Sequence, residues 1–152
     1  MKIYLIILIL TILFNGCAHK SAFDSFNFTK QQELSEDLLQ SSKIQKDGNV
    51  VGIVTALYLN NIDKNNYKNN EFFYIYMYTM DKNDTVSFLL NSKEAINIEK
   101  LKNPNKFTHL NNEDANWLTY YLVEFKKETR NLKLQIVSNS NTSDVLLFKK
   151  ED

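Results

Sequence analysis

The chain has few of the residue types that crosslink small folds or mark common active sites. Its 152 residues include one cysteine, one proline, three glycines and two histidines. A single cysteine excludes an internal disulfide, so stability must come from packing. No glycine-rich phosphate loop, no Gly-x-Ser-x-Gly sequence and no set of paired histidine or cysteine ligands occurs. We therefore expect no catalytic residues, no metal and no cofactor.

An excess of charge of one sign is also absent. The 18 basic and 18 acidic residues give a formal net charge of zero, and no block of lysine and arginine occurs along the chain. Affinity for nucleic acid and for anionic lipid headgroups depends on such clusters. The sequence therefore favours neither as a partner.

The first sixteen residues have the order of a secretory signal peptide. Met1 and Lys2 form a short basic start, Ile3 to Phe14 is a nearly unbroken apolar run, and Asn15-Gly16 ends it. The run is shorter than the roughly 20 apolar residues that span a membrane, so cleavage is favoured over retention as an anchor. An ordinary signal peptide cut near Ala18 or Ala22 is the alternative to the lipidated form considered next.

Cys17 directly follows this run, and its placement after Gly16 resembles the lipobox of bacterial lipoproteins. In that family the thiol is diacylated and the peptide is cut just before it. This chain departs from the pattern in having Phe14 where leucine is usual. The resemblance implies a lipoprotein signal peptide over 1–16, a lipidated tether over 17–28 and a folded domain over 29–152. It also implies a lipid-anchored protein of the cell envelope, at the outer membrane facing the periplasm in a Gram-negative cell, because no aspartate follows Cys17.

The folded part begins with a helical pattern. Thr29 followed by Gln32 fits a capping box, and Leu34, Leu38 and Leu39 lie on one side of a helix. The segment from Thr29 to Gln40 is therefore predicted to be a short amphipathic helix.

From Ser42 onward the apolar pattern has the period of two that is typical of strands. Three stretches are apolar on both faces, which predicts central strands at Val50–Leu59, Glu71–Met80 and Trp117–Phe125. Further strands are predicted at Ser42–Gln45, Thr85–Leu90, Ala95–Leu101, Leu132–Val137 and Val145–Lys149. Asp47-Gly48 signals a tight turn, and the Asn-rich stretches Asn60–Asn70 and Asn103–Asn116 are predicted to be loops. Seven or eight strands in one mainly β domain predict an antiparallel β-sandwich, with the helix over the tyrosine face of its central sheet.

The whole chain resembles small bacterial envelope lipoproteins that carry an immunoglobulin-like domain. Leu57-Tyr58-Leu59-Asn60 and the stretch from Asn116-Trp117 to Phe125 carry this resemblance. It implies an immunoglobulin-like sandwich, and it implies no catalytic residues.

Two functional classes follow from these features. The first is a non-enzymatic, membrane-anchored lipoprotein whose sandwich contacts other envelope proteins through its sheet edges or loops. The alternative is a module that binds carbohydrate such as peptidoglycan, with sugars stacked on exposed rings of Tyr74, Tyr76 and Tyr78. Packing of these rings in the core or under the helix is the other role open to them, and solvent exposure separates the two.

Two smaller motifs complete the candidate sites. His109 with Glu113 and Asp114 is the one cluster suited to acid-base or metal chemistry, although an ordinary polar loop is favoured because a second histidine or cysteine ligand is missing. Asp81, Asn83 and Thr85 resemble the N-glycosylation sequon used by periplasmic oligosaccharyltransferases of some Gram-negative bacteria. A hairpin turn without a sugar is the alternative for this segment.

The lipobox resemblance predicts that Cys17 is the lipidated N-terminus of the mature protein. We expect mass spectrometry of the membrane fraction to show acyl chains on Cys17. A Cys17→Ala variant should lose both this processing and its sedimentation with membranes, because each buried methylene contributes about 0.8 kcal/mol to anchoring. Continued processing and sedimentation of the variant would contradict the prediction.

Overall fold

A computed structural model describes residues 38–81, 85–111, 115–129, 131–139 and 141–150. The signal peptide, the tether with Cys17 and most of the predicted helix lie outside the described residues, as do Asn83, Glu113 and Asp114. Within the described residues, no helix is long and apolar enough to cross a membrane.

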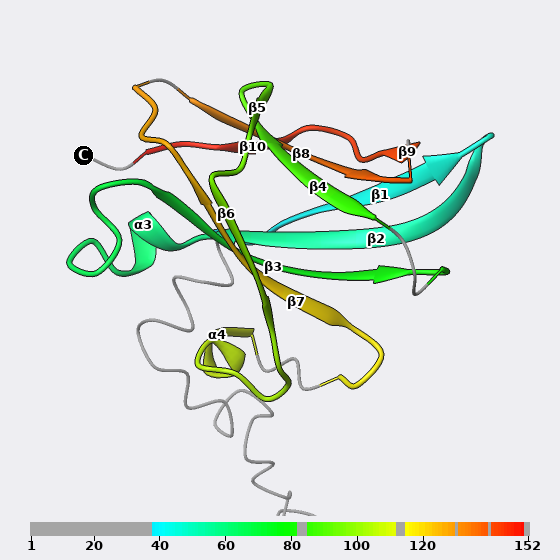
Figure 1. The fold of residues 1–152 in the computed structure, drawn as a ribbon, viewed down its shortest axis with the longest axis horizontal. Helices are drawn as coiled ribbons and strands as arrows, with labels where there is room; N and C mark the ends of the chain where they lie inside the picture. The colour runs from blue at the N-terminus through cyan, green and yellow to red at the C-terminus, as the bar shows by residue number, and fades with distance from the viewer. Residues whose placement is uncertain (1–37, 82–84, 112–114, 130, 140, 151–152) are drawn as a thin grey trace, which may run out of the picture.

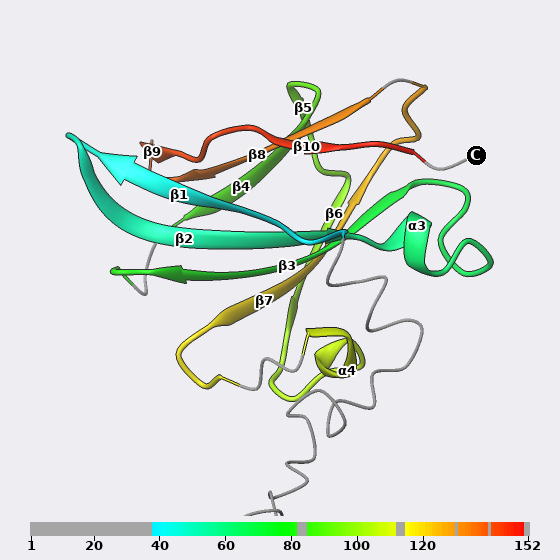
Figure 2. The ribbon, with the colours of Figure 1, turned by 180° about the vertical axis from the view of Figure 1, so that it is seen from behind.

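Ten strands form two antiparallel sheets that pack face to face (Figures 1 and 2). The first sheet has the order β1 (Gln40–Lys46), β2 (Asn49–Tyr58), β3 (Glu71–Thr79), β7 (Thr119–Phe125) and β6 (Asn97–Leu101). The second has the order β10 (Leu146–Phe148), β8 (Leu132–Ser138), β4 (Val86–Leu90) and β5 (Lys93–Glu94), and β9 (Asn141–Thr142) pairs with β8. The predicted mainly β, antiparallel sandwich is confirmed.

Each of the eight predicted strands corresponds to a strand of the structure. The count rises to ten because β5 and β9 are two residues long, too short for an alternating pattern to show in the sequence. The three stretches predicted as central are β2, β3 and β7, which lie side by side inside the first sheet. The prediction of Trp117 as a strand residue is wrong, since β7 begins at Thr119.

The turn between β1 and β2 has the chemistry that the sequence indicates. Asp47 and Gly48 both have positive φ values, 50° and 79°, between the paired residues Lys46 and Asn49. Two such residues in a two-residue loop match the right-handed twist of a hairpin, and glycine adopts this conformation without steric cost.

The two sheets are linked at both edges. Along one edge the chain changes sheets within a single step: the Ala95 backbone N–H donates to Phe88 O of β4 at 3.2 Å, and the next N–H, of Ile96, donates to Glu124 O of β7 at 2.8 Å. Along the other edge an isolated bridge joins Ile44 of β1 to Ser143, which follows β9. The main core fills the space between the sheets and includes the fully buried side chains of Phe73, Ile75 and Val123.

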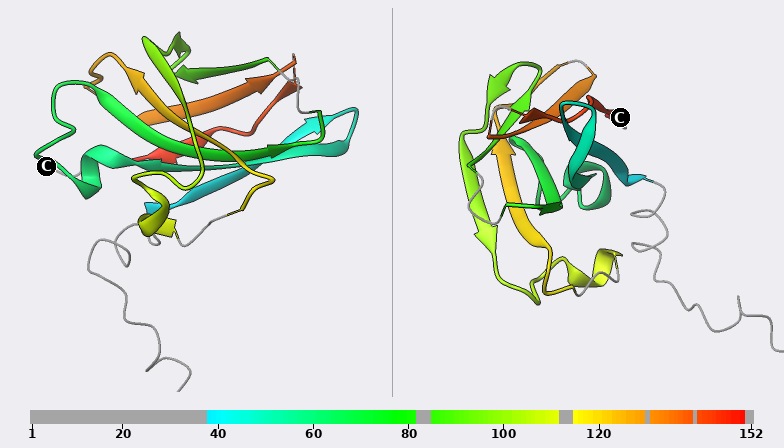
Figure 3. Two further views of the ribbon diagram at one scale, coloured as in Figure 1. Left: turned by 60° about the horizontal axis from the view of Figure 1, so that its bottom comes forward. Right: turned by 90° about the vertical axis from the view of Figure 1, so that its right-hand side faces the viewer.

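The outer face of the first sheet carries a second apolar cluster. Leu57, Tyr74 and Tyr120 of this face are covered by Phe107 and Leu110. These two come from the segment around the short helix α4 (Thr108–Asn111), which lies beside this sheet in Figure 3.

The predictions for this outer face therefore need correction. The stretch Asn103–Asn116 is more than a loop, because it contains α4, and the Leu110 N–H of this helix donates to the backbone oxygen of Phe107, the residue before the helix, at 2.9 Å. A second single-turn helix, α3 (Leu59–Ile62), follows β2 inside the other Asn-rich stretch. Of the residues predicted to form the covering helix, Leu38 and Leu39 pack against the second cluster, but the predicted end of that helix is wrong, since Gln40 is the first residue of β1.

Burial of Ile75 on β3 gives a direct test of the sandwich core. An aspartate there would place an unpaired charge between the sheets, at a cost of several kcal/mol against roughly 5–15 kcal/mol for a whole domain. We expect Ile75→Asp to abolish cooperative urea unfolding followed by circular dichroism. The matched control is Ile98→Asp, at a side chain 44% exposed on the edge strand β6, which should lower the free energy of unfolding by about 1 kcal/mol or less. Equal effects of the two changes would contradict the assignment of the core.

Candidate functional site

An open groove lies on the outer face of the first sheet, beside the region covered by Phe107 and Leu110. It has a volume of about 360 Å³ and is lined by Ser41, Ile53, Thr55, Tyr76, Tyr78, Trp117 and Leu118. We call it the aromatic groove. The side chains come from β1, β2, β3 and the turn before β7, and no charged side chain is among them. The groove therefore suits an apolar or uncharged ligand surface.

Strand register builds the two rows at the centre of the groove. Ile53 of β2 lies opposite Tyr78 of β3, and Thr55 lies opposite Tyr76. Because residues two apart on a strand share a face, all four side chains project from the same side of the sheet. The Trp117 ring packs edge-on against Tyr78, with ring centroids 5.9 Å apart and planes at 73°.

Three large apolar side chains of the groove are exposed to solvent. The exposed fraction is 63% for Trp117, 50% for Ile53 and 39% for Tyr78. Contiguous exposed apolar side chains of this size mark contact sites on soluble domains. The sequence does not predict that Trp117 is exposed. The one feature that could have indicated it is the position of Trp117 directly after a polar, Asn-rich segment.

The three tyrosines proposed for sugar stacking have different environments. Tyr74 is fully buried, with its ring 4.9 Å from that of Phe107 and stacked 6.2 Å from that of Tyr120. Its ring therefore has no face open to a ligand and forms part of the second apolar cluster. Tyr76 is half-buried beside the groove, and Tyr78 is exposed. The candidate row is thus reduced to Tyr76 and Tyr78, to which the structure adds Trp117.

Two aliphatic hydroxyl groups lie together in the groove lining. Ser41 Oγ and Thr55 Oγ1 lie 2.9 Å apart across the pairing of β1 with β2. Since one hydroxyl can donate to the other and still accept a further hydrogen bond, the pair keeps capacity for a polar ligand group.

His109 is exposed on α4 and borders a separate hollow of about 190 Å³, which is also lined by Asp63, Tyr67 and Lys106. The Asp63 carboxylate accepts hydrogen bonds from the side chain and backbone of Asn66, which hold its pKa below the usual value. The partners proposed for His109, Glu113 and Asp114, lie outside the described residues. Within the described part of the chain, no three His, Cys, Asp or Glu side chains converge as metal ligands.

The segment of the glycosylation sequon connects the two sheets. β3 belongs to the first sheet and β4 to the second, so these two strands do not pair with each other as a hairpin. Asp81 and Thr85 are exposed, and Thr85 is held by two hydrogen bonds with Asn139 across the sheet end. Both described ends of the sequon thus lie at the surface.

A buried carboxylate, that of Glu71, is the centre of a hydrogen-bonded polar cluster. Glu71 is 1% exposed, and its oxygens accept hydrogen bonds from the Tyr58 hydroxyl at 2.5 Å, Lys150 Nζ at 2.5 Å and the Glu128 backbone N–H at 2.7 Å. Burial, together with the hydrogen bond to Glu71, raises the pKa of Tyr58 far above its usual value. All three donors belong to the protein, so this carboxylate has a structural role within the fold. Sequence analysis places Glu71 only as the first residue of a strand.

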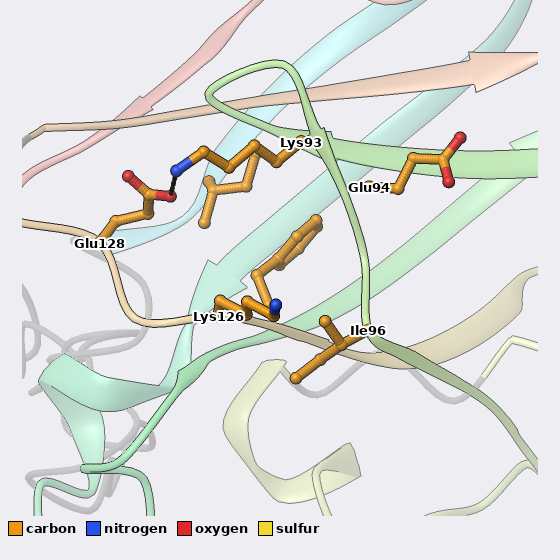
Figure 4. A pocket seen from close by; sticks show the side chains of 7 residues that line it. Lys93, Glu94, Ile96, Lys126 and Glu128 are labelled. Carbon is orange, nitrogen blue, oxygen red and sulfur yellow. Dashed lines mark hydrogen bonds and ion pairs between the residues drawn. The ribbon is translucent and has the colours of Figure 1, made fainter.

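Glu128 extends this cluster to a neighbouring hollow of about 260 Å³ (Figure 4). Its carboxylate accepts a hydrogen bond from Lys93 Nζ at 2.6 Å and one from Asn91 Nδ2 at 3.3 Å. Leu90 and Phe125 supply apolar lining, and Glu94 points away from Glu128. Because Lys93 and Glu128 neutralise each other, this hollow is a weaker candidate than the aromatic groove.

Comparison of the chain with protein-family models, curated proteins and solved structures finds no match.

The Glu71 cluster predicts a large effect of a small substitution. Glu71→Gln keeps the shape of the side chain but leaves Lys150 beside a neutral amide, so we expect a loss of about 3 kcal/mol in the free energy of unfolding. Glu99→Gln, on exposed β6, is the matched control and should change little. Adding Lys150→Met to Glu71→Gln should restore part of the stability in urea titrations, because it removes the uncompensated ammonium. Equal stability of Glu71→Gln and Glu99→Gln would refute a stabilising ion pair.

Proposed function

We propose that this chain is a membrane-anchored, non-enzymatic lipoprotein of a bacterial cell envelope, and that its sandwich contacts other envelope proteins in the periplasm through the aromatic groove. The signal peptide and Cys17 supply the anchor, at the outer membrane in a Gram-negative cell. The observation that supports this contact surface is that the side chains of Trp117, Tyr78 and Ile53 are exposed on one face of the sheet.

The chemistry of the groove supports a protein partner with an apolar, uncharged contact segment. Tryptophan and tyrosine are enriched among the residues that dominate protein interfaces, where they fill pockets and exclude water. Among the described residues that line the groove none is charged, which favours contacts other than ion pairs. The proposed contact lies on a sheet face. The sequence alone favours sheet edges or loops for this contact.

Carbohydrate binding is the second candidate, and the Ser41–Thr55 hydroxyl pair beside aromatic rings favours it. A sugar chain stacks best on rings that present a common plane. Tyr78 and Trp117 are steeply inclined to each other and form no such platform. For this reason we rank peptidoglycan or another glycan below a protein partner.

We propose that the resemblance to immunoglobulin-like domains is one of architecture. In constant-type immunoglobulin domains the second and third strands lie in different sheets. Here β1, β2 and β3 are consecutive neighbours in one sheet. The shared feature is therefore the packing of two antiparallel sheets.

The contact surface is tested by site-specific photocrosslinking in living cells. A photoreactive residue at position 53 in the groove should trap a discrete envelope protein. The same residue at position 147, where Leu147 is 61% exposed on β10 of the other sheet, should not. Adding Trp117→Ala should reduce the adduct at least tenfold without unfolding the domain, because the removed ring is mostly exposed.

His109→Ala is the control for loss of function. His109 is exposed and lies outside the groove lining, so the adduct and the fold should persist in this variant. An adduct that survives Trp117→Ala, or is lost with His109→Ala in a folded protein, would reject the groove as the contact site. Sedimentation with purified peptidoglycan that depends on Trp117 would replace the protein partner by the glycan.

A further inference from the structure

Four lysines from three separate segments of the chain converge on one small hollow. Lys64 and Lys68 come from the loop after α3, Lys127 follows β7, and Lys150 follows β10. The hollow has a volume of about 170 Å³, and we call it the lysine pocket. Figures 1 and 2 both place α3 and the C-terminal end of β10 at the same end of the sandwich.

The charge of the lysine pocket is unbalanced. Glu71 is the one acidic residue among the nine described residues that line it, and its carboxylate already accepts hydrogen bonds from Tyr58, Lys150 and the Glu128 backbone. The remaining lining is uncharged: Tyr58, Asn60, Asn61 and Tyr67. Like charges held in one hollow repel one another, and a bound anion offsets this repulsion.

The backbone helps to fix this arrangement. Lys127 Nζ donates to the backbone oxygen of Lys68 at 3.2 Å, which holds these two residues together across the pocket. Lys150 is fixed by Glu71 and by the backbone oxygen of Glu128. The pocket therefore presents ammonium groups from segments that are anchored to the fold, and ammonium groups are suitable point-charge donors to phosphate oxygens.

The first described residues of the chain lie at the same end of the domain as the lysine pocket. Leu38 and Gln40 line a hollow of about 430 Å³ together with Lys149, Lys150 and Tyr58, and the last two also line the lysine pocket. Twenty residues separate Cys17 from Leu38, and a chain of that length spans at most about 70 Å. With a lipid on Cys17, this end of the sandwich would therefore be within reach of the membrane surface.

We propose that the lysine pocket binds the phosphate groups of anionic lipid headgroups and forms a second membrane contact beside the anchor. The proposal rests on the lipid anchor proposed above. A lipid chain combined with a basic surface holds a protein at a membrane more firmly than either alone. The sequence alone disfavours anionic lipid as a partner, because no basic block occurs along the chain. Folding brings together lysines that are separated in the sequence.

The test uses the proposed mature chain from residue 17 with Cys17→Ser, so that no acyl chain contributes. We expect it to sediment with vesicles of phosphatidylcholine mixed with phosphatidylglycerol, not with phosphatidylcholine alone, and to be released by high salt. Lys68→Gln and Lys127→Gln should each lower the partition coefficient about fivefold. The matched control is Lys46→Gln, an exposed lysine at the β1–β2 hairpin, which should leave it unchanged.

Equal binding to both kinds of vesicle, or an equal loss with Lys46→Gln, would overturn the proposal. Nuclear magnetic resonance with inorganic phosphate separates the two sources of the anion. Shifts confined to the lysine pocket without vesicle binding would replace the headgroup by free phosphate. Whether Cys17 is lipidated is measured separately, from the mass of the N-terminal peptide of the protein made in cells.

Discussion

The buried carboxylate of Glu71 is the constraint on which one whole end of the sandwich depends. A charge in the interior is tolerated only when it is paired and hydrogen-bonded. Glu71 meets this condition with donors from three other segments: Tyr58 at the end of β2, the Glu128 backbone after β7, and Lys150 after β10. Asn61 of α3 adds a hydrogen bond to the backbone oxygen of Lys149 at 2.9 Å. All of these segments must be folded for Glu71 to be fully hydrogen-bonded. Their contact at Glu71 also determines the shape of the lysine pocket.

The outer face of the first sheet has a covered half and an exposed half. Phe107 and Leu110 cover the half that contains Tyr74, while the half that contains Tyr78 and Trp117 faces solvent among the described residues. The covered half therefore supplies a fixed base for exposed rings next to it. One alternating strand, β3, therefore contributes Tyr74 to the covered half and Tyr78 to the exposed half.

Local patterns in the sequence predict the strands and the β1–β2 hairpin, because side-chain alternation and turn chemistry are set by neighbouring residues. They do not separate Tyr74 from Tyr78, which have the same pattern on the same face of β3. The difference arises from the Phe107 segment, more than 25 residues away, which covers one ring and leaves the other open. The lysine pocket is hidden for the same reason, since Lys68 and Lys127 become neighbours only through the pairing of β3 with β7.

The change of sheet at Ala95 and Ile96 has a consequence for how the molecules behave when crowded. Because the chain leaves one sheet and joins the other there, the edge strands on this side are short: β5 has two residues and β6 has five. Exposed charged side chains, Lys93, Glu94, Glu99 and Lys100, line these edges. Short, charged edges oppose the addition of a strand from another molecule, which is the first step of aggregation by sheet extension. Where molecules of this protein meet one another, this edge therefore opposes the growth of shared sheets.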